Sequence, residues 1–136
     1  MSRLAGNLGG DLGWLRERLQ VMQSISLNDL ADQQLAIAAE ASSGRSAHTL
    51  HGGPDHALRQ TVIALAAGNS LSDHESPGEA TLHVLRGRVR LTTATDAWEG
   101  ASGDHIVIPS ERHGLAALTD AVVLLTVYTH VTPKTS

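Results

Sequence analysis

From about residue 46 onward, short apolar segments alternate with turns that contain glycine or proline, and this pattern leaves few folds open. Many short strands at regular spacing are typical of β-sandwiches and β-barrels. No helical stretch separates these segments after residue 58, which argues against a parallel sheet with crossover helices. We therefore expect an all-β domain, with strands at 47–50, 58–66, 81–85, 89–92, 97–99, 104–108, 113–118 and 122–130.

The preceding segment has the periodicity of helices instead. Asp11 is placed to cap a first helix whose apolar stripe is Leu12, Leu15, Leu19 and Met22. Ser26 is placed to cap a second helix at 27–41, with Asp29 near its positive end. The buried face of this second helix is predicted to be Leu27, Leu30, Ala31, Gln34, Leu35 and Ala38. The sequence thus predicts a helical extension over 1–45 and a β-barrel domain over 46–136.

Composition narrows the function classes. The 136 residues suffice for one core, and the chain has no cysteine, which excludes disulfides, thiolate metal sites and cysteine nucleophiles. Its formal net charge is −4, and its only basic cluster is Arg86, Arg88 and Arg90, which we interpret as a solvated strand face. We expect no nucleic-acid partner. No apolar run is long enough for a membrane span and no signal peptide is evident, so we expect a cytoplasmic protein without a membrane partner.

Two spaced motifs lie within the predicted barrel. The first runs from Gly68 through His74, Ser76 and Ala80 to Gly87. It resembles the first cupin motif, G-x5-H-x-H-x3-E-x6-G, with both glycines and the first histidine in register. Glycine suits the bends at its two ends because it adopts positive φ without strain.

The second motif begins at Gly103, with 15 residues between it and Gly87, and continues through Pro109, Glu111 and His113 to Ala117. It resembles the second cupin motif, G-x5-P-x-G-x2-H-x3-N, although it is one residue short before the histidine. The resemblance covers roughly residues 56–130. It implies a double-stranded β-helix, that is, a jelly-roll cupin barrel with a pocket between two sheets, and it also implies a homodimer.

Cupin metals usually bind two histidines and a glutamate of the first motif and one histidine of the second. Carried over by position, the resemblance places these ligands at His74, Ser76, Ala80 and His113. Serine and alanine do not replace imidazole or carboxylate, so we expect a degenerate site that binds a divalent metal such as Zn, Fe, Mn or Ni weakly. His74 and His113 are expected to point into the pocket from facing strands.

Four further side chains are candidates for the pocket or for a third metal ligand. Glu79 and His83 alternate with Ala80 and are expected on the opposite face, but a bulge after Pro77 would let one of them serve as a third ligand. Either Arg59 or Gln60 should face the pocket. We choose Gln60 because burying an unpaired guanidinium is costly. The predicted pocket therefore consists of His74, Ser76, Ala80, His113 and Gln60.

Three histidines, His48, His51 and His56, flank Gly52-Gly53-Pro54, but their spacing matches no zinc signature, and we interpret the segment as a flexible loop. The sequence has no G-x-S-x-G motif and no phosphate-binding glycine loop, and it identifies no catalytic residue. The leading interpretation is a module that binds or senses a small molecule. The alternatives are a metal-dependent oxygenase, isomerase or decarboxylase, and a dimeric protein with a structural or interaction role.

Overall fold

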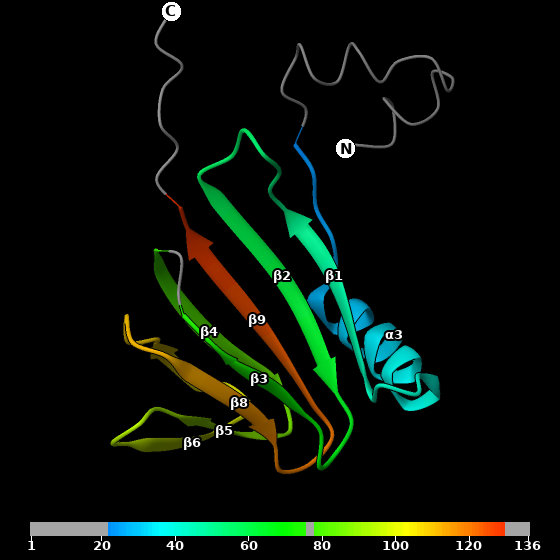
Figure 1. Cartoon of the computed structure of the whole chain (residues 1–136). Helices are drawn as coiled ribbons and strands as arrows, with labels where there is room; N and C mark the ends of the chain where they lie inside the picture. Colours follow the sequence, from blue (N-terminus) through cyan, green and yellow to red (C-terminus); the bar gives the residue numbers. More distant parts are fainter. Residues whose placement is uncertain (1–21, 76–77, 130–136) are drawn as a thin grey trace, which may run out of the picture.

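A computed structural model describes residues 22–75 and 78–129, and within them two antiparallel sheets enclose the main core (Figure 1). The five-stranded sheet has the order β1-β2-β9-β4-β7, with bounds β1 Arg45–His51, β2 Leu58–Leu65, β9 Ala121–Tyr128, β4 Glu79–Arg86 and β7 His105–Val107. The four-stranded sheet has the order β3-β8-β5-β6, with bounds β3 Ser70–His74, β8 His113–Ala117, β5 Arg88–Thr92 and β6 Ala97–Ala101.

Strands that are distant in the sequence pair within each sheet. β9 pairs with β2 along its whole length, from Leu58↔Tyr128 to Leu65↔Ala121, and its other edge pairs with β4. In the second sheet, β8 lies between β3 and β5. This order is that of a jelly roll, so the fold class predicted from the sequence is confirmed.

The core between the sheets follows from the alternation of side chains along each strand. On β4, for example, Ala80, Leu82 and Val84 point inward, and their cross-strand partners on β9 do the same. The buried members of this cluster are Leu65, Ala80, Leu82, Val84, Val89, Leu91, Ile108, Leu115, Ala117, Ala121 and Val123. No phenylalanine is present, so branched aliphatic side chains fill the barrel.

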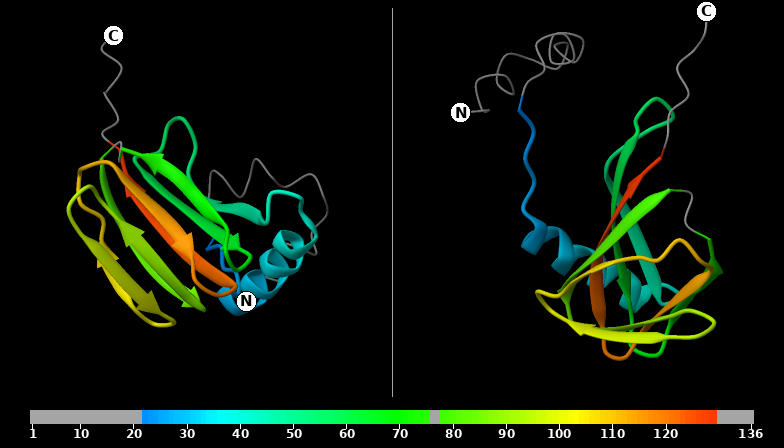
Figure 2. Two further views of the ribbon diagram at one scale, coloured as in Figure 1. Left: turned by 60° about the horizontal axis from the view of Figure 1, so that its bottom comes forward. Right: turned by 90° about the vertical axis from the view of Figure 1, so that its left-hand side faces the viewer.

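The helix α3 (Leu27–Glu40) covers part of the outer face of the five-stranded sheet, as Figure 2 shows. The backbone N–H of Asp29 donates to Ser26 Oγ at 3.2 Å, which confirms the predicted cap. Leu30, Ala31 and Ala38 pack in a second cluster with residues of β2 and β9. The predicted helix at 27–41 is therefore correct to one residue, whereas the helix predicted from Asp11 lies outside the described residues. Within the described part of the chain, no helix has the length and hydropathy to cross a membrane.

Sequence analysis missed β3. Its residues are mostly polar and exposed, and only the side chain of Leu71 packs against the barrel core. A half-exposed strand rich in serine and aspartate lacks the β-branched and aromatic residues that indicate a strand. The omission matters because β3 ends at His74.

The predicted homodimer stays a prediction. Among the described residues, Leu58 and Tyr128 form an exposed cross-strand pair on the outer face of the five-stranded sheet. Light scattering at tens of micromolar chain concentration should give twice the mass of 14.3 kDa. A mass of one chain under those conditions would contradict the prediction.

The turn at Gly87 gives a test of the barrel topology. Its φ is 75°, and a Cβ there would collide with the backbone carbonyl of Asp120, whereas Gly103 has a φ of 93° and open space around it. We expect Gly103→Ala to cost roughly 1–2 kcal/mol of unfolding free energy through backbone strain alone. Gly87→Ala should cost about 1–3 kcal/mol more, because β4 and β5 must shift away from β9. Chemical denaturation that gives equal losses for the two variants would contradict this account of the turn.

Candidate functional site

His74 and His113 lie side by side at one end of the barrel. They are direct partners in the ladder between β3 and β8, and their ring centroids are 4.7 Å apart with an interplanar angle of 60°. The sequence analysis expected the two histidines on facing strands. They come instead from neighbouring strands of one sheet. His113 is only 4 % exposed, whereas His74 is exposed to solvent.

Hydrogen bonds orient both rings in the same way. His74 Nδ1 lies 3.0 Å from the carbonyl oxygen of Ser72, and His113 Nδ1 lies 2.9 Å from that of Glu111. A carbonyl oxygen only accepts hydrogen bonds, so Nδ1 carries the hydrogen of each neutral ring. The lone pair of Nε2 is then available to accept a hydrogen bond from a ligand or to bind a metal.

β2 contributes Arg59, not Gln60, to the barrel side of the five-stranded sheet. Gln60 shares its face with Val62, which packs against α3, and its Nε2 donates to Thr126 Oγ1 at 3.3 Å. Arg59 shares the opposite face with Ile63, which packs against the barrel core. The choice of Gln60 was therefore wrong. It assumed that this position is buried, whereas Arg59 is exposed at the open end, where a guanidinium keeps its hydration.

Arg59 lines an open cleft of about 400 Å³ at the β1–β2 hairpin. The other lining residues are Thr49, His51, Gly52, Gly53, Pro54 and Thr61. The hairpin also brings the rings of His51 and His56 to a centroid distance of 4.9 Å. The sequence contained a signal for Arg59, because the alternation that places Ile63 and Leu65 in the core extends back to residue 59.

A second cleft, of about 310 Å³, opens beside the turn between β5 and β6. Its apolar wall is formed by Leu91, Trp98 and Ile106, and Glu111 lies at its edge. The connections β1–β2, β5–β6 and β7–β8 lie at the same end of the jelly roll as His74 and His113. The open end of the barrel is therefore the candidate functional site.

Comparison with known proteins finds solved structures that share this architecture. No family model and no curated protein matches the chain. Among solved structures, a cupin superfamily protein from Desulfitobacterium hafniense is similar, with a TM-score of 0.62, 19 % identity, and coverage of 81 % of this chain and 95 % of that one. An RmlC-like cupin from Desulfovibrio desulfuricans has a TM-score of 0.60 at 23 % identity and covers 79 % and 97 %. The chain has the cupin fold.

A third similar structure is a conserved protein of unknown function from Streptococcus pyogenes, with 28 % identity, a TM-score of 0.61 and coverage of 68 % of this chain and 80 % of that one. The similarity of these structures establishes the fold but assigns no activity, because one fold supports many reactions.

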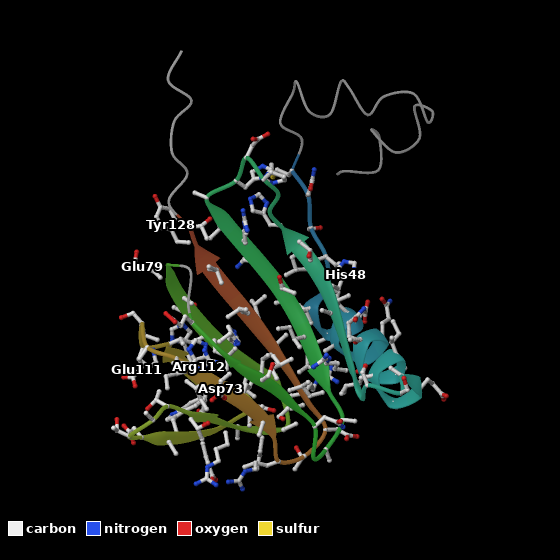
Figure 3. The ribbon with its side chains drawn as sticks, in the orientation of Figure 1. His48, Asp73, Glu79, Glu111, Arg112 and Tyr128 are labelled. Atoms are coloured by element: carbon white, nitrogen blue, oxygen red, sulfur yellow. The ribbon has the colours of Figure 1, made fainter. Side chains whose placement is uncertain are left out.

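The cupin ligand positions are only partly filled by metal-binding side chains. Ala80 is 5 % exposed and belongs to the barrel core, where the resemblance places a carboxylate. Ser76 lies outside the described residues. Glu79 and His83 occupy the outer face of β4, as the alternation predicts, and Figure 3 shows Glu79 beside Tyr128, its partner on β9.

The donor set therefore does not fit a tightly held divalent ion. Residues 22–75 and 78–129 contain no group of three or more histidine, cysteine, aspartate or glutamate side chains arranged to hold a metal. His74 and His113 supply two nitrogen donors, which is half of a tetrahedral shell. Neither Glu79 nor His83 is placed on the inner face of β4 to act as a third ligand.

The orientation of the two rings can be tested directly. In neutral form, both His74 and His113 should be protonated at Nδ1, because each Nδ1 faces a backbone carbonyl. Long-range ¹H–¹⁵N correlation spectra of the imidazoles at alkaline pH distinguish the two tautomers. Spectra that show Nε2–H for both rings would contradict the hydrogen bonds described above, and the exposed ring of His48 serves as a reference.

Proposed function

We propose that this cupin-fold protein binds a small organic molecule at the open end of its barrel and that its metal site is degenerate. The observation that carries the proposal is Ala80. A buried methyl group stands where the resemblance places a carboxylate ligand, and it packs against Leu82 and the rest of the apolar core. Such a position offers a metal no electron pair.

The two histidines support the same proposal. With Nδ1 held by backbone carbonyls, each Nε2 presents one hydrogen-bond acceptor toward solvent or ligand. Small-molecule sites combine an apolar wall with a few placed polar groups, and His74 and His113 are the polar groups in this proposal. Binding in this form needs no covalent step and no metal.

Elemental analysis of the protein, purified without an affinity tag, tests the proposal. We expect clearly less than one Zn, Fe, Mn or Ni per chain, and we expect dialysis against a chelator to remove it, because two imidazoles leave at least half of the shell to water. His74→Ala and His113→Ala should abolish the residual metal. The exposed position of His74 makes its variant the safer test, since His113 is buried and its replacement also removes packing.

His83→Ala is the matched control because His83 lies on the outer face of β4, and its metal content should equal that of the unmodified protein. One metal ion per chain that survives the chelator would overturn the degenerate site and would establish the protein as a metal-dependent cupin. If His83→Ala, but not His74→Ala, lost the metal, the residual ion would belong to the outer face of β4, and the assignment of a degenerate metal site to His74 and His113 would be wrong.

A further inference from the structure

We infer that the ligand carries a carboxylate and that Arg59 binds it. This inference rests on the proposed function and extends it to a chemical class of ligand. Arg59 projects from the barrel side of β2 into the cleft formed with the β1–β2 hairpin. The site that results lies beside the cupin metal position and does not include it.

The charge around Arg59 is unbalanced. The ion pairs within residues 22–75 and 78–129 use Arg86, Arg88 and Arg90, and none of them uses Arg59. Among the described residues, no aspartate or glutamate lines the cleft. A guanidinium without an acidic partner that faces a cleft matches a carboxylate, which it binds through two parallel hydrogen bonds.

The aliphatic stem of Arg59 packs against the β1–β2 hairpin. A Cβ on Gly52 would lie 2.9 Å from Arg59 Cγ, so the aliphatic part of the arginine packs against the glycine backbone. Gly52 has a φ of 130°, which favours glycine. Thr49 and Thr61, which are cross-strand partners, add two hydroxyl groups to the same cleft. The site is thus a guanidinium whose aliphatic stem packs on the hairpin, with two hydroxyl groups in the same cleft.

The register of the five-stranded sheet places Arg59 in one row with apolar residues of the barrel. Arg59 pairs with Val127 on β9, and Val127 pairs with Ala80 on β4, so all three share one inward row. Neighbouring strands are about 4.8 Å apart, which places the Cα atoms of Arg59 and Ala80 roughly 10 Å from each other. One small molecule can place its carboxylate at Arg59 and its apolar body toward the half-buried Val127, and Ala80 lies in the core beyond it.

The charge count favours a carboxylate over a phosphate. In the part of the chain that the structure describes, Arg59 is the one permanent cation that lines the cleft. A single guanidinium balances the single charge of a carboxylate, whereas a phosphate dianion would keep an uncompensated charge next to the apolar residues of the barrel. We therefore assign the ligand to the monocarboxylic acids with an aromatic or branched apolar body.

Titrations monitored by ¹H–¹⁵N amide spectra test the assignment, with benzoate as the probe. Benzamide has the same shape without the charge, and inorganic phosphate supplies an oxyanion without the apolar body. We expect benzoate to shift the amides around Arg59, Thr61 and Val127, with at least about tenfold higher affinity than benzamide. Arg59→Gln should reduce the benzoate affinity by about tenfold or more, because a charge-assisted bidentate contact is lost.

Arg90→Gln is the matched control. Arg90 is an arginine that alternates with the core residues Val89 and Leu91, so it lies on the outer face of β5 and its replacement should leave benzoate binding unchanged. Equal affinity for benzoate and benzamide at this cleft would overturn the carboxylate assignment and leave the proposed small-molecule function standing. Tighter binding of phosphate, equal losses in Arg59→Gln and Arg90→Gln, or no shift with benzoate would also overturn it.

Discussion

The structure depends on the two ladders of β9. This strand forms the centre of the five-stranded sheet, with β2 along one edge and β4 along the other. Its inward residues, such as Val123, complete the barrel core, and its outward Val122 completes the cluster beneath α3. The last described strand therefore fixes the positions of elements that come much earlier in the chain. The inward row that contains Arg59 and Ala80 exists only because Val127 joins their strands.

The candidate site combines features of the cupin fold with side chains that are particular to this sequence. The bends and the buried aliphatic rows are those of a cupin barrel, and they keep His113 at the start of β8 beside His74 at the end of β3. Within that frame, a buried methyl group occupies residue 80, where the resemblance places a metal-binding carboxylate, and an arginine without an acidic partner among the described residues occupies the same row two strands away. In the function proposed above, these two positions favour binding of an organic anion over metal ligation.

Sequence reasoning succeeded where one local rule decided the outcome. Ser26 and the apolar spacing after it predicted α3, and the alternation along β4 placed Glu79 and His83 on the outside. It failed at β3, whose stability comes from pairing with β8 and not from its own composition. It also failed at Arg59, because the cost of burying a charge depends on how far the barrel end is open. The alternation along β2 pointed to Arg59, but the openness that decides this cost is set by the β1–β2 hairpin.

The most direct test of this account is amide chemical-shift mapping with protein that has been freed of metal by dialysis against a chelator. A panel of small carboxylates, amines and neutral aromatic molecules would be added to this metal-free protein. The account predicts that at least one of them binds and that the shifted amides cluster around Arg59, Ala80 and His113. Binding that appears only after Zn, Fe, Mn or Ni is restored would contradict it, as would shifts confined to the face covered by α3.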